Sequence, residues 1–393
     1  MHLARGLTQS GTRPMNASPS VIDTLTHLIS IPSVNPNYSG GSGEGEIGQW
    51  VFDFFERKNL QVVKQPIETG RFNVIVRIPG RTSNRRIVFE AHLDTVSAEG
   101  MTIAPFCPKL EGGRIYGRGA CDTKAGLSAM MHAMVELSNQ RCDCEVWLAA
   151  TVDEEYSYRG VAGFCEQHKK FDAAVIAEPT ELRAIIASKG LLRCKIITKG
   201  TSAHSAKPHL GDNAILQMLP IIERLQLDAH QLQNTHHPLL GHATCNIGVI
   251  KGGIQINFVP DHCEIEIDRR LLPHETPFEI WEHYRNLVDE VMEYHSGIQA
   301  ELLPPLLTDS PLSTDPDDHA VSTISQVLAS HHLPTEPGGV PFCSDASKFG
   351  NLGIPSLIFG PGSIDQAHAA IEYVECEQVQ KAVEIYRDFA INF

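Results

Sequence analysis

The sequence lacks three features that would each have indicated a protein class. No Cys-x-x-Cys pair occurs, which excludes a zinc ribbon. No apolar run approaches the ~20 residues of a membrane-spanning helix. The first 20 residues contain Arg5 and Arg13 but no apolar segment, so they do not form a secretory signal. We expect residues 1–18 to be a disordered extension or tag, with Met15 as the natural start.

Basic residues are also scarce. The chain has 32 Lys and Arg against 47 Asp and Glu, which gives a formal net charge of -15. Nucleic acids and anionic membranes attract basic surfaces, so we expect neither as a partner. The 10 cysteines show no regular framework, which indicates reduced thiols in a cytoplasmic protein. With 42% hydrophobic and 20% charged residues, the 393-residue chain is an ordinary globular protein of two or three domains.

Helical and β-strand patterns alternate along the first half of the chain. The apolar spacing predicts helices at 21–29, 46–60, 123–137 and 161–169, and strands at 61–67, 72–78, 87–91, 145–152 and 173–177. Such alternation is typical of an α/β fold, here a three-layer α/β/α catalytic domain with a mixed sheet. We place the first part of this domain at residues 19–190.

The pattern changes after residue 190. Strands are predicted at 191–198, 244–250 and 263–269, and in the last of these Cys263, Ile265 and Ile267 alternate with acidic residues. This alternation indicates an antiparallel sheet with one wet face, whose dry face helices at 213–227 and 277–294 would cover. We therefore expect a small inserted α+β domain at 191–302. The α/β pattern returns at 303–393, with helices at 319–330 and 377–389 and a strand at 355–359.

The stretch from Val88 to Val96 is the first candidate for chemistry. It begins as a short apolar strand and ends with His92 and Asp94, two residues apart. A histidine can bind a metal through one ring nitrogen while a carboxylate holds the other. A strand that ends in a solvated polar turn is the alternative. The supply of matching groups downstream favours the metal site; these groups are Asp122, Glu154, Glu155, Glu178 and His368.

Most of these candidates follow predicted strands. In an α/β sheet, catalytic groups gather beyond the carboxyl ends of the strands. The segment 117–124, Gly-Arg-Gly-Ala-Cys-Asp-Thr-Lys, superficially resembles a phosphate loop, but it lacks the Gly-Lys-Ser/Thr ending of that motif. We interpret it as a tight loop that places Asp122 at a helix N-terminus, where its two oxygens could bridge two cations.

Glu154 and Glu155 form the most informative pair. Two adjacent carboxylates are costly to bury unless a cation neutralises them, and the apolar run before them argues against an exposed turn. One could ligate a metal while the other takes a proton from a bound water. A cation lowers the pKa of such a water from ~16 to about 7, which supplies a hydroxide nucleophile at neutral pH. Mixed His and carboxylate ligands suit Zn²⁺, with Co²⁺ or Mn²⁺ as alternatives.

The chain resembles the M20 family of co-catalytic metallopeptidases and deacylases. The motifs that carry this resemblance are His-x-Asp-x-Val at 92–96, Gly-Arg-Gly-x-x-Asp-x-Lys at 117–124, Asp-Glu-Glu at 153–155, Glu-Pro-Thr at 178–180, and Gly-Pro-Gly…His…Glu-Tyr at 360–373. They occur in the family's order and at similar spacing, from about residue 31 to residue 374.

The resemblance implies two zinc ions per subunit and assigns a role to each candidate. The metal ligands would be His92 and Glu178 for one ion, Glu155 and His368 for the other, and Asp122 as the bridge between them. Glu154 would be the general base and later the acid that protonates the leaving amine. Asp94 would orient His92. The inserted domain would be the family's lid and the surface through which it forms a homodimer.

The resemblance also extends to the substrate pocket. His204, in the loop 200–208, would polarise the scissile carbonyl as an oxyanion stabiliser, often in the active site of a partner subunit. Asn257 and Arg270 match positions that contact the carboxylate end of the substrate, and an arginine fork suits a carboxylate. Ser344 would shape the pocket wall. For each of these residues an ordinary surface or turn position is the alternative.

The segment 360–368 is most similar to the acetylornithine deacetylase version of the last motif. It favours hydrolysis of an N-acyl amino acid, with N-acetylornithine first, which would place the enzyme in arginine biosynthesis. The sequence departs from the family at Ala369–Ile371 and at Tyr156 and Tyr158, which could line the side-chain pocket. A succinyl-diaminopimelate desuccinylase or an exopeptidase is the first alternative. A non-catalytic metal-stabilised binding protein is the second, against which the presence of Glu154 argues.

Overall fold

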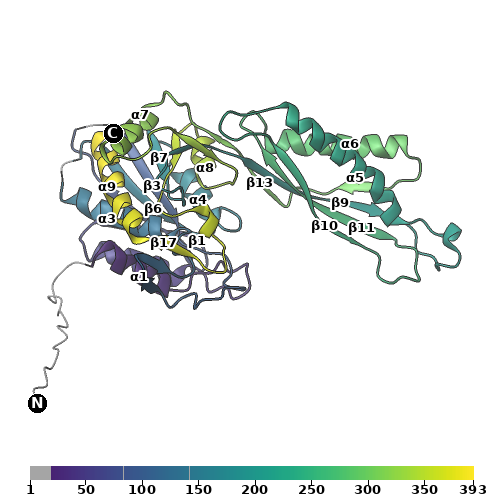
Figure 1. The fold of residues 1–393 in the computed structure, drawn as a ribbon, viewed down its shortest axis with the longest axis horizontal. Coiled ribbons are helices and arrows are strands. Elements are labelled where there is room, and N and C mark those ends of the chain that lie inside the picture. The colour runs from purple at the N-terminus through teal and green to yellow at the C-terminus, as the bar shows by residue number, and fades with distance from the viewer. Residues whose placement is uncertain (1–18, 83, 141) are drawn as a thin grey trace, which may run out of the picture.

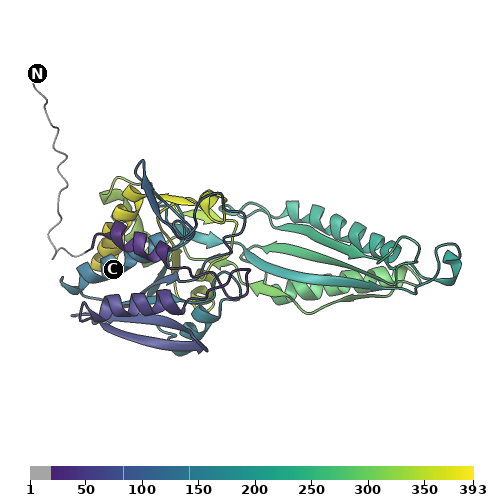
Figure 2. The same ribbon diagram turned by 90° about the horizontal axis from the view of Figure 1, so that it is seen from below.

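The computed structural model describes residues 19–82, 84–140 and 142–393. The chain forms two bodies, a broad one that contains both ends of the described chain and a narrow one that projects from it (Figures 1 and 2). The predicted extension at 1–18 lies outside the described residues. Within the described residues, no helix has the length and apolar content that a bilayer crossing requires. All ten cysteines are free thiols.

The broad body is built on a nine-stranded mixed sheet, in the order β1-β2-β6-β3-β7-β16-β8-β14, with β15 paired to β8. Its strands are β1 (Gln61–Glu68), β2 (Arg71–Ile78), β3 (Arg86–His92), β6 (Glu145–Thr151), β7 (Ala173–Ile176), β8 (Ile185–Ser188), β14 (Leu312–Ser313), β15 (Gly338–Val340) and β16 (Ser356–Ile358). The central strands β6, β3, β7 and β16 run parallel. Their carboxyl ends therefore meet at one edge of the sheet.

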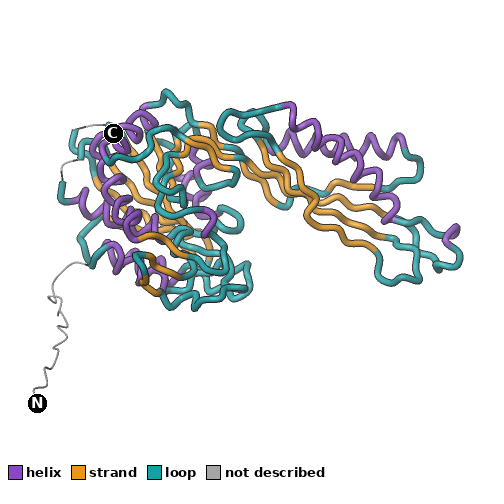
Figure 3. Tube along the Cα trace, in the orientation of Figure 1, coloured by secondary structure: helices purple, strands orange, loops and turns teal. Residues whose placement is uncertain are grey.

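Helices cover both faces of this sheet (Figure 3). On one face lie α1 (Val21–Ser30), α2 (Gly45–Glu56), α3 (Lys124–Ser138), α7 (His319–Ser330) and α9 (Cys376–Asn392), and on the other α4 (Arg159–Gln167) and α8 (Ala346–Gly350). The apolar side chains of each layer form a separate core, because successive strand residues point to opposite faces. The predicted three-layer α/β/α architecture is confirmed.

The narrow body is a second, antiparallel sheet with two helices. Its strands are β9 (Gly190–Lys199), β10 (Thr244–Gly252), β11 (His262–Leu271), β12 (Ala300–Leu302) and β13 (Leu307–Asp309). The helices α5 (Ala214–Gln231) and α6 (Pro277–Tyr294) pack on one face through a core that includes Cys263, Ile265 and Ile267. The acidic residues between them face the other side, as the alternation predicted. β13 pairs with β9, although we assigned residue 303 onward to the catalytic domain.

A small third sheet joins distant parts of the chain beside the main one. It consists of β4 (Lys109–Glu111), β5 (Arg114–Tyr116) and β17 (Tyr373–Glu375), in the order β17-β5-β4. Tyr373 pairs with Tyr116, which brings the stretch before β17 next to the loop that begins at Gly117. Three single-turn 3₁₀ segments, η1 (Pro208–Leu210), η2 (Leu232–Asn234) and η3 (Ile364–Gln366), lie in the connecting loops.

Candidate metal centre and active-site cleft

The predicted metal ligands converge at the carboxyl edge of the parallel strands. His92 is the last residue of β3, Glu155 follows β6, and Glu178 follows β7. Asp122 precedes α3, whose N-terminus faces the same edge. His368 comes from the loop that follows β16. Short parallel strands with apolar side chains on both faces thus bring together residues that are far apart in the sequence.

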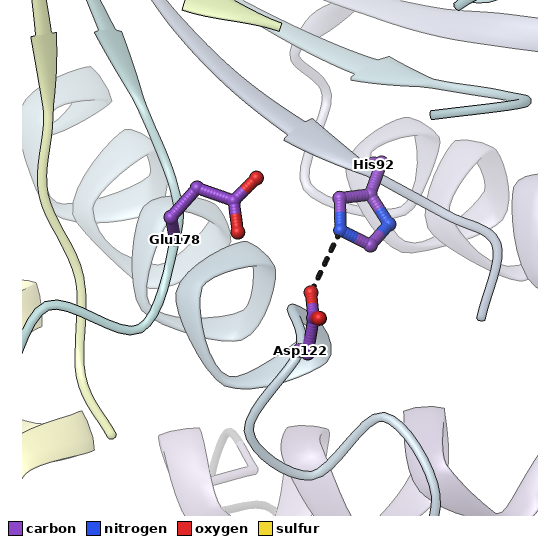
Figure 4. A group of neighbouring side chains, drawn as sticks. All are labelled: His92, Asp122 and Glu178. Carbon is purple, nitrogen blue, oxygen red and sulfur yellow. Dashed lines mark hydrogen bonds and ion pairs between the residues drawn. The ribbon is translucent and has the colours of Figure 1, made fainter. Parts of the chain in front are cut away.

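Asp122 lies at the centre of the cluster. Its Oδ1 is 3.0 Å from Nε2 of His92, and its Oδ2 is 3.2 Å from Nε2 of His368. His368 Nε2 is also 3.2 Å from Oε2 of Glu155. Two groups of ligand atoms, His92–Asp122–Glu178 (Figure 4) and Asp122–Glu155–His368, each lie within 4.8 Å of one another. Asp122 belongs to both groups, so the geometry suits a bridging carboxylate between two cations.

The cluster contains more buried acid than its histidines can neutralise. Burial and neighbouring carboxylates raise the pKa of Glu154, Glu155 and Glu178. Burial alone would also raise the pKa of Asp122, but hydrogen bonds to His368 and His92 lower it instead. Hydrogen bonds to Asp122 and Glu155 raise the pKa of His368 to about 11. Buried carboxylates at this density are costly without cations, and their oxygen and imidazole ligands fit Zn²⁺, Co²⁺ or Mn²⁺.

Asp94 supports the site mainly through its neighbours. Its carboxylate accepts hydrogen bonds from the backbone N–H groups of Glu154 and Glu155, at 3.1 and 3.2 Å. Its own backbone carbonyl lies 3.0 Å from Nδ1 of His92, whereas its carboxylate lies 3.6 Å away. Asn35, which we did not predict, donates from Nδ2 to both Asp94 and Asp153. Asp94 therefore positions the Glu154–Glu155 turn as well as His92.

Glu372 is a second residue that sequence reasoning did not assign. Its buried carboxylate accepts hydrogen bonds from the backbone N–H groups of Gly119, Cys121 and Asp122 and from Arg118 Nη1. The loop that carries the shared carboxylate is thus fixed by the C-terminal part of the chain. In the sequence, only the Glu-Tyr pair of the last motif drew attention to Glu372. That pair did not indicate that Glu372 bonds to the loop of Asp122.

A cleft of about 600 Å³ opens above the cluster, between the two bodies. Its floor includes Asp122, Glu154, Glu155, Glu178 and His368, and its walls include Tyr38, Tyr156 and Tyr158 from the broad body. Arg193 and Arg270 line it from the narrow body, which corresponds to the predicted inserted domain. Ser344 is fully buried, and its Oγ accepts a hydrogen bond from the N–H of Ala346; its neighbour Cys343 lines the cleft instead.

The structure does not bring His204 and Asn257 to the cleft of their own chain. Both lie in loops at the far end of the inserted domain, where the N–H of Ser205 bonds to the carbonyl of Asn257. β9 runs from the cleft at Leu191 to this end at Lys199, a span of about 26 Å at ~3.3 Å per residue. Neither side chain can reach the metal ligands without a second copy of the chain or a large movement.

Known proteins resemble this chain in sequence and in fold. The model of "Peptidase family M20/M25/M40" matches residues 88–392. A probable carboxypeptidase from Aspergillus clavatus is 30% identical over 95% of this chain and 88% of its own. An acetylornithine deacetylase from Pectobacterium carotovorum is 28% identical over 95% of this chain and 98% of its own. The crystal structure of an M20 family metallo-carboxypeptidase from Sulfolobus solfataricus, 19% identical, covers 95% of this chain and 99% of its own with a TM-score of 0.78.

Proposed function

The chain belongs to peptidase family M20/M25/M40, and we propose that it hydrolyses the amide bond of an N-acyl amino acid with the help of two divalent cations. The observation that carries this proposal is the pair of ligand groups that share Asp122, with the half-buried Glu154 in the same cleft. A single structural metal would not require a bridging carboxylate or an open cleft.

The metals would be held by the two groups already described. His92 and Glu178 would bind one ion, Glu155 and His368 the other, and Asp122 both. When bound, the ions would acidify a water and polarise the carbonyl of the substrate. The donor set favours zinc, with Co²⁺ or Mn²⁺ as alternatives.

Glu154 is the proposed general base. It lines the cleft but belongs to neither ligand group, so its carboxylate is available for proton transfer. Burial and the nearby Glu178, Asp345 and Glu155 raise its pKa, although the charge of His92 opposes this. A raised pKa suits a group that must take a proton from water and return it to the leaving amine. This role argues against a non-catalytic binding protein on the same fold.

The amino-acid end of the substrate would meet Arg270. Arg270 lines the cleft, and its Nε bonds to Asp268. The terminal nitrogens of its guanidinium would bind the α-carboxylate through a fork of hydrogen bonds. N-acetyl-L-ornithine is the first substrate to test, because of the likeness of residues 360–368 and of the deacetylase relative. A desuccinylase or an exopeptidase would use the same metal centre with a different pocket lining.

We further propose that the active form is a homodimer through the inserted domain, with His204 acting in the partner's cleft. The position of His204 and Asn257 at the far end of that domain supports this, as do the exposed side chains of Ile254 and Ile256 in the same loops. Exposed apolar side chains at a projecting tip are typical of a protein interface.

Release of free amine from N-acetyl-L-ornithine tests the proposal. The enzyme is assayed with added Zn²⁺ or Co²⁺ and with a chelator. Fast release that the chelator abolishes supports both the metal site and the pocket. If no N-acyl amino acid is hydrolysed by protein with two bound metals, the proposed function is wrong, although the metal site stands.

A further inference from the structure

The inserted domain presents two arginines to the cleft rather than one. Arg193 lies on β9 and Arg270 on the neighbouring β11, and both line the cleft. Asp268 joins them: its Oδ2 is 2.9 Å from Nε of Arg193, and its Oδ1 is 2.7 Å from Nε of Arg270. Because one carboxylate holds both guanidiniums, they are close neighbours on the same wall. Together the three side chains keep a net positive charge.

The outer fork of Arg193 is free to bind a ligand. Its Nε faces Asp268, whereas its two terminal nitrogens have no hydrogen-bond partner among the described residues. Its side chain is 47% exposed, and that of Arg270 is 27% exposed. A guanidinium whose two terminal N–H groups are open can bind a carboxylate through two parallel hydrogen bonds.

The surroundings of Arg193 strengthen its attraction for anions. Burial and the charges of Arg270 and Arg269 lower the pKa of Lys189, a further basic side chain at this end of the inserted domain. Across the cleft, burial and nearby carboxylates raise the pKa of Tyr38 to about 12, and Arg193 opposes this increase. The charge of Arg193 therefore reaches the opposite wall. A positive wall is unusual in a chain whose formal net charge is -15.

We propose that Arg193 is a specificity-determining residue that selects N-acyl amino acids with a carboxylate in the side chain. The inference rests on the proposed function, in which Arg270 binds the α-carboxylate. Since Arg193 and Arg270 share Asp268, a second carboxylate bound by Arg193 must lie on the same side of the scissile bond, in the amino-acid part of the substrate. The ammonium group of ornithine would face like charges at this wall, whereas the side chain of glutamate or aspartate would complement them.

The test compares N-acetyl-L-glutamate with N-acetyl-L-glutamine, which have nearly the same shape but differ in charge. In the metal-loaded wild type we expect kcat/KM to favour the glutamate derivative by about ten- to hundredfold, the range of one charged hydrogen-bonded pair. In Arg193→Gln this preference should disappear while hydrolysis of the glutamine derivative changes little. Arg193→Lys, which keeps the charge without the fork, should be intermediate.

Lys195→Gln is the matched control. Lys195 lies two residues further along β9 on the same face, is paired with Glu264 and Glu266, and does not line the cleft. This variant should keep the wild-type preference. Equal rates on both substrates in the wild type, or a preference that persists in Arg193→Gln, would overturn the inference.

Calorimetric binding of L-glutamate and L-glutamine separates this inference from the proposed function. Tighter binding of glutamate that depends on Arg193, without hydrolysis of any N-acyl amino acid, would refute the proposed reaction but retain the selectivity. Hydrolysis of N-acyl amino acids without any preference for an acidic side chain, in turnover or in binding, would retain the reaction and refute the role of Arg193.

Discussion

The carboxylate of Glu372 accepts a hydrogen bond from the backbone N–H of Asp122 at 3.1 Å, although the two residues are 250 positions apart in the chain. The same carboxylate binds two further N–H groups of that loop and the side chain of Arg118. Glu372 lies just before β17 of the small third sheet. It therefore holds in place Asp122, the residue that both ligand groups share. Support of this kind orients metal ligands without touching the metal.

Replacement of Glu372 tests this support. In Glu372→Gln, the side-chain amide can still accept hydrogen bonds through its oxygen, but its NH₂ group faces N–H donors that it cannot satisfy. We expect metal affinity to fall by about 10–100-fold, the usual effect of losing such a partner, as measured by competition with a chelating dye. Glu375→Gln, on β17, where the side chain forms an ion pair with Arg114, is the control. Unchanged affinity in Glu372→Gln would show that the loop holds Asp122 by itself.

The number of metal ions that a variant binds should depend on whether the mutated residue belongs to one ligand group or to both. We expect His92→Ala and His368→Ala each to retain one of two metal ions, and Asp122→Ala to retain neither, because Asp122 belongs to both groups. Elemental analysis after gel filtration in metal-free buffer measures this directly. Two ions in His368→Ala would show that the second group extends beyond the residues described above.

Glu154→Gln should separate proton transfer from metal binding. The amide cannot take up a proton, so we expect kcat to fall by at least about 10²–10⁴-fold, the contribution usual for a general base. Metal content should stay at the wild-type level, because Glu154 is in neither ligand group. Glu166→Gln, on the exposed face of α4, controls for the loss of one negative charge. Full turnover in Glu154→Gln would eliminate it as the base.

Strong local patterns made much of the fold predictable. The helices at Pro277–Tyr294 and His319–Ser330 have the predicted bounds, because each has a capping side chain directly before it, Thr276 and Asp318, and a sustained apolar face. The strands β4, β5 and β17 were not predicted. Each has only three residues, too few for a periodic pattern. In addition, the pairing of β17 with β5 depends on contacts across more than 250 positions.

The residues of the site likewise include some that the sequence predicts and some that it does not. The ligands at strand ends were predictable because each follows an apolar run that identifies a buried strand. Asn35, Glu372 and Arg193 were not, because their roles arise from partners that are distant in the sequence. Arg193 and Lys195 follow the same alternating pattern on β9, and only the tertiary structure shows that Arg193 lies at the cleft. Sequence alone also could not show that β9 separates His204 from the cleft.

Lys124 provides a prediction of pH dependence. Its ammonium group is buried beneath the Gly119 loop and donates to the backbone carbonyls of Leu28 and Ile31. Burial lowers its pKa from 10.5 to about 7, although Glu372 opposes the shift. The folded protein therefore binds fewer protons at this site than the unfolded chain between about pH 7 and pH 10, so this contribution to stability increases as the pH rises.

Between pH 7 and pH 10.5, we expect the free energy of unfolding of the metal-free wild type to increase by up to about 4–5 kcal/mol relative to that of Lys124→Met. This value follows from ~1.4 kcal/mol per pKa unit. Urea unfolding of both proteins across this range measures the difference, in which the titrations of other groups cancel. A constant difference would mean that Lys124 remains charged in the folded protein throughout.

The position of His204 allows a test by hybrid dimers. If His204 acts in the cleft of a partner subunit, His204→Ala and Glu154→Gln should each be nearly inactive alone, since each dimer then lacks one group in both sites. When the two variants are mixed under conditions that exchange subunits, half of the dimers are hybrids, and each hybrid has one complete site. We expect about a quarter of wild-type activity to return. If mixing restores no activity although mass measurements show hybrids, His204 does not act in trans.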